Sequence, residues 1–179
     1  MRKVLYIFGL LTDADVAWIA STGIRRRVSR GEILIREGLP VESVIILLQG
    51  ECLVTAQAVG EIARLGAGEI VGEMSFVDSA PPSATVTATS DGLALFLDKN
   101  AMSSKLEADV AFGYRFYRAL SIFLADRLRA TVHRLGYGTQ EHLDAHSMAR
   151  DELDTNVLDT VSMAGERFDR MLKMLGADR

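Results

Sequence analysis

Short apolar segments separated by glycine-containing turns fill the middle of the chain, and they constrain the fold more than any other feature. The apolar segments are 33–35, 43–48, 52–54, 61–65, 84–88 and 93–97, and the turn glycines between them are Gly31, Gly38, Gly50, Gly60, Gly66, Gly68 and Gly92. Strands that recur roughly every eight to twelve residues are typical of an antiparallel barrel or sandwich. The sequence therefore predicts a β-roll.

A helix is predicted before the roll. Thr12 and Asp15 have the spacing of a capping box, with Asp in place of the usual Glu, and apolar residues then recur at helical spacing. The predicted helix runs from about residue 13 to 21 and ends at Gly23.

Helical periodicity returns after the roll. Apolar residues from Phe112 to Leu135 predict one long helix, preceded by a shorter helix over 99–106 and followed by a flexible joint at 136–138. The fold class is therefore α+β, mainly β: an antiparallel β-roll (a jelly-roll-like, double-stranded β-helix) flanked by an N-terminal helix and long C-terminal helices.

The last segment, 139–179, differs from 1–138 in charge, since it carries nine acidic and five basic side chains. We expect a main domain at 1–138 and an acidic helical tail at 139–179. An a/d heptad seam in the tail predicts docking on another surface, so we expect a homodimer or a partner protein bound through helices 112–135 and 150–175. The seam residues are Val157, Val161, Ala164, Phe168, Met171 and Leu175.

Composition limits the possible partners and the compartment. The formal net charge of −4 gives no global attraction to nucleic acid, and the arginines at 25–27 are expected to be a solvated strand edge. No apolar run is long enough to span a membrane, and the apolar run after Arg2 has no export cleavage site. A single cysteine, Cys52, excludes a disulfide within the chain and suggests a reducing, cytoplasmic location.

Four stretches at 31–38, 44–50, 68–75 and 81–86 carry a resemblance to a known family. Their glycines and flanking residues resemble the cyclic nucleotide-binding domain, which is found in catabolite activator protein and in the regulatory subunits of cAMP-dependent kinase. The resemblance runs from about residue 10 to 135. It implies the fold described above and, as ligand, a cyclic nucleotide such as cAMP or cGMP.

The resemblance also implies a binding site. In this family a short helix that opens with Gly-Glu holds the cyclic phosphate, and here it would consist of Gly72, Glu73, Met74 and Ser75. The Glu73 carboxylate would accept a hydrogen bond from the ribose 2′-hydroxyl.

The family's phosphate-binding arginine is replaced in this sequence. Pro82 occupies that position, followed by Ser83 and Ala84. Proline offers neither a charge nor a backbone donor, so we expect the site to keep its cradle and lose its strongest anion contact.

The family's long C-terminal helix closes over the base, and the family pattern places Arg127, Arg129 or Thr131 near the purine. A solvated helix face is the alternative for both arginines.

Two functions stay open at this point. One is a non-enzymatic regulatory module that senses cAMP or cGMP through a degenerate site, and the other is a ligand-free scaffold that acts through its C-terminal helices. No catalytic constellation or cofactor motif is present in the sequence. His142 and His146 lie at i, i+4 but without a clear third ligand, so we expect no metal site, and we expect no DNA-binding domain.

Overall fold

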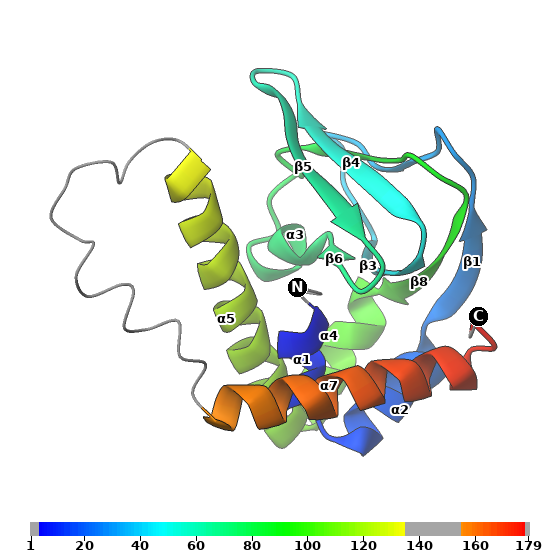
Figure 1. Cartoon of the computed structure of the whole chain (residues 1–179), viewed down its shortest axis with the longest axis vertical. Helices are drawn as coiled ribbons and strands as arrows, with labels where there is room; N and C mark the ends of the chain where they lie inside the picture. The colour runs from blue at the N-terminus through cyan, green and yellow to red at the C-terminus, as the bar shows by residue number, and fades with distance from the viewer. Residues whose placement is uncertain (1–3, 135–154, 178–179) are drawn as a thin grey trace, which may run out of the picture.

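The structure is a computed structural model that describes residues 4–134 and 155–177. Two four-stranded sheets form the roll, and helices gather along one side of it (Figure 1). The predicted joint at 136–138 and the histidines of the tail lie outside the described residues.

Every strand pairing in the roll is antiparallel. One sheet has the order β1 (Ile24–Val28), β8 (Gly92–Asp98), β3 (Ser43–Gln49), β6 (Ile70–Val71). The other has the order β2 (Ile33–Ile35), β7 (Thr85–Ala88), β4 (Glu51–Ala56), β5 (Gly60–Gly66). The predicted antiparallel β-roll is confirmed.

The first sheet separates two hydrophobic cores. On β3, Val44, Ile46 and Leu48 face the helices, whereas Ile45 and Leu47 face the interior of the roll. Successive side chains of a strand point to opposite faces, so this continuous apolar run is buried on both sides. The sheet therefore connects the roll to the helical layer.

Six helices are described: α1 (Val4–Leu10), α2 (Asp13–Thr22), α3 (Glu73–Val77), α4 (Lys99–Ala108), α5 (Val110–Arg134) and α7 (Thr155–Met174). The predicted helices at 13–21, 99–106 and 112–135 correspond to α2, α4 and α5. Helix α1 was not predicted, because its apolar residues show no polar face and no cap.

A buried ion pair joins α2 to the N-terminal half of α5. The Asp15 side chain is 4% exposed. It accepts two hydrogen bonds from the Arg115 guanidinium, at 2.8 and 2.9 Å, and one at 2.7 Å from the amide of Thr12. The amide of Asp15 donates in turn to the Thr12 hydroxyl at 3.2 Å, which completes the predicted capping box.

Helix α7 packs against α1 and α2 (Figure 1). Three seam residues, Ala164, Phe168 and Met171, are buried in the same core as α5, and the Phe168 ring lies 6.0 Å from that of Phe8. Arg167 donates to the carbonyl of Phe8 at 3.0 Å and to Asp13 at 2.8 Å. This part of the seam is thus occupied by the chain itself and is not free for a partner, contrary to our expectation for the tail.

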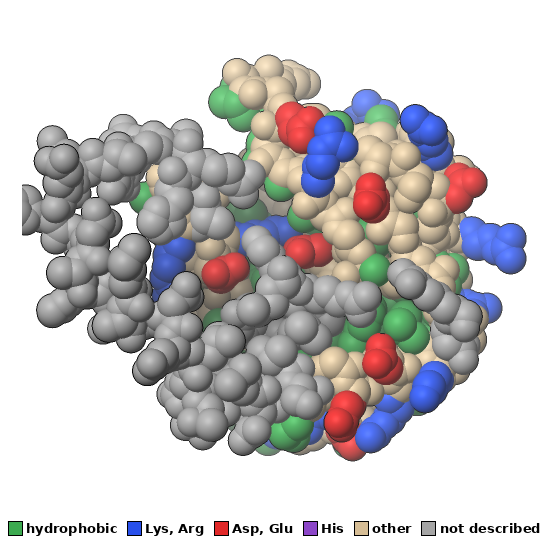
Figure 2. Space-filling view, in the orientation of Figure 1, with side chains coloured by type: hydrophobic (Ala, Val, Ile, Leu, Met, Phe, Trp, Pro, Cys, Tyr) green, Lys and Arg blue, Asp and Glu red, His purple; other side chains and the backbone are tan. Residues whose placement is uncertain are grey.

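Charged side chains are interspersed on the face shown in Figure 2, with acidic and basic groups side by side over the strands. None of the described helices combines the length and the apolar character that crossing a bilayer requires.

Candidate functional site

Gly72 allows α3 to begin close to strand β3. Its φ of +82° lies in the left-handed region, and a Cβ built on it would meet the Ser43 carbonyl oxygen at 2.8 Å. Only glycine accepts both conditions without strain. The amide of Phe76 donates to the Gly72 carbonyl, so the amides of residues 73–75 precede the first donor of the helix. The predicted cassette is therefore a short helix whose first amides lie outside its α-helical hydrogen bonds.

The Glu73 side chain, expected to meet the ribose, is 2% exposed and points toward α5. Its Oε1 lies 2.5 Å from a terminal nitrogen of Arg127, and the other terminal nitrogen donates to the Ile70 carbonyl at 3.3 Å. The guanidinium also lies 4.7 Å from the centre of the Phe123 ring. The structure thus brings together two predicted site residues that are 54 positions apart, and joins them directly.

Burial dominates the electrostatics of this carboxylate. Removal of Glu73 from water raises the pKa of its carboxyl above the ordinary value of 4.5. The Arg127 guanidinium opposes this shift only in part, and the nearby charge of Glu69 adds to it. A group held in this way retains its charge less firmly than an ordinary carboxylate.

The segment after α3 contains the position of the missing arginine. Pro82 is half-buried, Ser83 is exposed and Ala84 is half-buried. The Pro82 carbonyl accepts a hydrogen bond from the amide of Gly38 at 2.8 Å, which fixes the segment to the end of β2. This contact is made by the backbone, so the register of the segment does not depend on the proline ring.

The other two residues predicted near the purine are exposed on α5. Arg129 is exposed, and the exposed Thr131 donates its hydroxyl to the Arg127 carbonyl at 2.9 Å on its own helix. Met74 is exposed, and Ser75 is buried.

Sequence reasoning missed Lys99, whose ammonium donates to the Ser75 carbonyl at 3.0 Å. No local pattern marks this contact, because it joins α3 to α4 across 24 positions.

Comparisons with known proteins agree with this architecture. Residues 25–109 match the family model described as the cyclic nucleotide-binding domain. A cyclic nucleotide-binding domain from Methylobacillus flagellatus is similar in structure, with a TM-score of 0.69 and 26% identity over 79% of this chain and 85% of that one. The catabolite activator protein of Thermus thermophilus shares the fold, with a TM-score of 0.63 and 20% identity over 96% of this chain and 86% of that one.

A curated relative places the same segment in a longer protein. A putative potassium channel protein of Rhodopseudomonas palustris is 32% identical over 94 residues, which are 51% of this chain and 23% of that protein. The chain thus spans less than a quarter of this relative's length.

Proposed function

Because residues 25–109 match the family model of the cyclic nucleotide-binding domain, we propose that this chain is a non-enzymatic regulatory module that senses cAMP or cGMP. In this proposal the cassette at Gly72, Glu73, Met74 and Ser75 holds the cyclic phosphate. One observation carries it: the buried Glu73 carboxylate is paired with Arg127 of α5. We call this ion pair the latch.

The latch gives the ligand a means to move α5. If the ribose hydroxyl donates to Glu73, it competes with the Arg127 guanidinium for the same oxygen atoms. Loss of the Arg127 contact is expected to cost about 1–2 kcal/mol, because Glu73 can take up a proton, so the ligand must replace the lost contact to bind well. Release of Arg127 would free the C-terminal half of α5, and that movement is the proposed signal.

Competition with Arg127 and the replacement at Pro82 both weaken the affinity for an anionic ligand. Loss of a phosphate–arginine contact is expected to reduce binding by roughly two to three orders of magnitude. If a nucleotide binds only chains in which the latch is open, its apparent affinity is reduced by the fraction of chains that are open. We therefore expect weak binding by the native chain.

Isothermal titration calorimetry with cAMP and cGMP, up to millimolar ligand, tests the latch. Arg127→Met removes the competitor and should increase cyclic nucleotide affinity about tenfold. Arg129→Met, two positions from Arg127 on the same helix, should leave the affinity unchanged. A loss of affinity in Arg127→Met would instead make Arg127 a ligand contact and refute the latch.

A second titration tests the missing arginine. Pro82→Arg should increase the affinity for cyclic nucleotide by roughly two orders of magnitude, because it supplies a bidentate, charge-assisted phosphate contact. The neighbouring Pro81 is exposed, which makes Pro81→Arg a matched control for the added charge. Equal effects of the two substitutions would mean that position 82 does not face the phosphate.

A second candidate function is an interaction module without a ligand, and an exposed stripe on α5 favours it. Two groups of exposed apolar or aromatic side chains share one face of this helix, opposite the buried Phe112 and Phe116, and the polar Ser121 lies between them. The large ones are Val110, Tyr114, Tyr117, Leu128 and Val132. Exposed apolar groups on one face of a helix are typical of a protein interface. Under this alternative, α5 pairs with α5 of a second copy.

Sedimentation equilibrium separates the two candidates. Association through the stripe predicts a dimer that Leu128→Glu dissociates, while the same protein stays folded because Leu128 is 65% exposed. A monomeric wild type at tens of micromolar protein would exclude this interface.

A further inference from the structure

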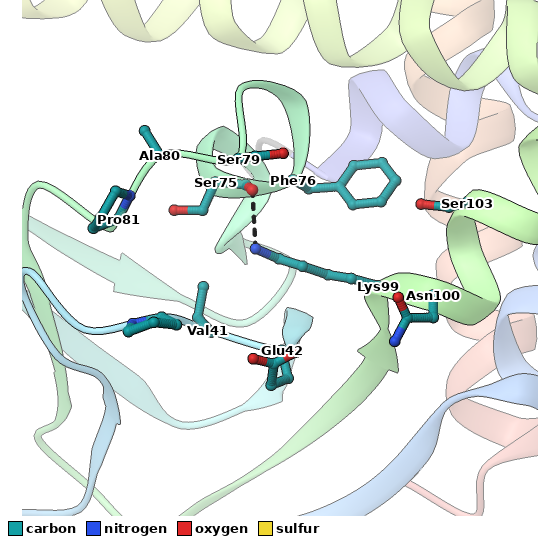
Figure 3. A pocket seen from close by; sticks show the side chains of 11 residues that line it. Val41, Glu42, Ser75, Phe76, Ser79, Ala80, Pro81, Lys99, Asn100 and Ser103 are labelled. Carbon is teal, nitrogen blue, oxygen red and sulfur yellow. Dashed lines mark hydrogen bonds between the residues drawn. The ribbon is translucent and has the colours of Figure 1, made fainter.

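A cleft of about 300 Å³ opens on the roll away from the latch. One wall is the segment that precedes β3, with Val41 and Glu42, and the other is α3 with the residues that follow it. The first turn of α4 closes the cleft with Lys99 and Ser103 (Figure 3). Neither the latch residues nor Pro82 line it, and Ser75 is the one cassette residue that it shares with the cyclic nucleotide site proposed above.

Lys99 places a cation in this cleft. Its side chain extends between the two walls (Figure 3) and donates one hydrogen bond, to the Ser75 carbonyl. Among the described residues, no carboxylate forms an ion pair with it. Partial burial lowers the pKa of the ammonium, and the more distant charges of Glu42 and Asp78 oppose that shift. An ammonium has three donors, so two remain for a ligand.

The Ser75 hydroxyl gives the cleft a second polar group beside the Lys99 ammonium. The residue lines the cleft and is only 7% exposed, yet its hydroxyl has no hydrogen-bond partner among the described residues. The Ser75 oxygen is not sealed in the interior, so it is open to a molecule in the cleft.

The charges that surround the cleft limit the chemistry of the occupant. Glu42 lines it with an exposed carboxylate that forms no ion pair within the described part of the chain, and Asp78 lies close enough to act on Lys99. Two carboxylates and one ammonium oppose a phosphate, whose charge at neutral pH is near −2. A molecule with one negative and one positive group would match Lys99 and Glu42 at once.

The apolar lining suggests the rest of the molecule. Phe76, Val41 and Pro81 offer carbon surface between the charged groups. A cleft of about 300 Å³ suits a small molecule better than a nucleotide, since drug-sized ligands fill pockets of roughly 300–1,000 Å³.

We propose that this cleft binds a free α-amino acid, with its carboxylate on Lys99 and the Ser75 hydroxyl, its ammonium on Glu42, and its side chain against Phe76. Because Lys99 also holds the Ser75 carbonyl, the occupied cleft would stabilise α3 and so act on the cassette from its far side. The site does not depend on whether the cassette binds a cyclic nucleotide.

Ligand pairs on the wild-type chain test the proposal without any substitution. Titrations followed by nuclear magnetic resonance would use L-leucine, its methyl ester, N-acetyl-L-leucine, acetate and inorganic phosphate. Leucine should bind about tenfold more tightly than either blocked form, since each lacks one charged contact. Equal binding of N-acetyl-L-leucine and leucine would overturn the role of Glu42, and preferential binding of phosphate would overturn the amino acid class.

Matched substitutions locate the site. Lys99→Met and Glu42→Gln should each weaken leucine binding about tenfold, whereas Lys173→Met and Glu107→Gln, at exposed positions elsewhere, should not. Resonances of residues 41, 75 and 99 should shift on addition of leucine. Shifts confined to other residues, or no binding of leucine at millimolar concentration, would refute the proposal.

Discussion

Two buried carboxylates bind arginines of the same helix, and they are held very differently. Asp15, 4% exposed, pairs with Arg115 in the N-terminal half of α5, and Glu73, 2% exposed, pairs with Arg127 in the C-terminal half. Burial would raise the pKa of Asp15, but the hydrogen bonds from Arg115 and Thr12 lower it below its ordinary value. Burial raises the pKa of Glu73, and its single arginine contact does not reverse the shift.

The difference lies in the number of donors rather than in burial. Asp15 accepts three hydrogen bonds in fixed geometry, two of them from one guanidinium. Glu73 accepts one hydrogen bond from Arg127 and one from its own backbone amide, and it lies near the like charge of Glu69. We infer that the Asp15 pair is a permanent clamp and that the Glu73 pair is a releasable latch, so that only the C-terminal half of α5 is free to respond.

The largest expected effect is at the clamp. Arg115→Met leaves a buried carboxylate without its main partner and should lower the free energy of unfolding by about 3–5 kcal/mol. Urea unfolding followed by circular dichroism measures it, with the exposed Arg118→Met as control. A loss no larger than that of the control would contradict the clamp.

The same substitution at the latch should cost less. Arg127→Met is expected to lower the free energy of unfolding by about 1–2 kcal/mol, because Glu73 can take up a proton and avoid a bare buried charge. The same urea experiment gives the value. If the two arginines prove equally costly, the distinction between clamp and latch is wrong.

Thr12 forms two hydrogen bonds with Asp15, and among the described residues Glu73 has no comparable neighbour at a helix cap. A substitution of Thr12 therefore tests what these contacts add to the clamp. Thr12→Ala removes the capping hydroxyl of α2 and should cost about 1 kcal/mol. Combined with Arg115→Met, the two losses should not add, because both substitutions remove contacts of the same residue, Asp15. Simple additivity in a double-mutant cycle would show that the capping box and the ion pair are independent.

The smallest expected effect is a pair of opposite pH dependences. The pKa of Asp15 is lower in the folded chain than its ordinary value of 3.8. Its contribution to the free energy of unfolding is therefore present above pH 3.8 and is lost as the pH falls through the folded pKa. The pKa of Glu73 is higher in the folded chain than its ordinary value of 4.5. Its contribution to the free energy of unfolding is therefore complete below pH 4.5 and is lost as the pH rises through the folded pKa.

Unfolding free energies from pH 3 to 8 test these signs. The free energy of unfolding of the wild type minus that of Asp15→Asn should rise with pH at the acid end. The same difference between the wild type and Glu73→Gln should fall with pH above 4.5. Curves of the same sign would contradict the assignment for one of the two carboxylates.

Local features of the fold were accessible from the sequence. The capping box of Thr12 and Asp15 spans three residues, so its spacing alone predicted where α2 begins. Each predicted strand segment likewise appears in the roll, because alternating apolar residues and turn glycines act over short distances. Gly72 and Glu73 were found because a family resemblance marks them.

Contacts between distant elements were not accessible in the same way. Arg127 was assigned to the purine, but the structure pairs it with Glu73, and nothing in either local sequence specifies that choice. The seam of α7 was predicted to be a docking surface. Its apolar residues do pack against another surface, but their spacing does not say which surface that is. Phe168 packs against Phe8 of the same chain.

Hydrogen exchange along α5, followed by mass spectrometry, tests the account most directly. Glu73→Gln removes the charge that holds Arg127 without altering the helix itself. The account predicts faster exchange than wild type in residues 124–132 and unchanged exchange in 112–120, where Arg115 remains clamped to Asp15. Unchanged exchange in both halves, or equal acceleration in both, would contradict the claim that the latch alone controls the C-terminal half.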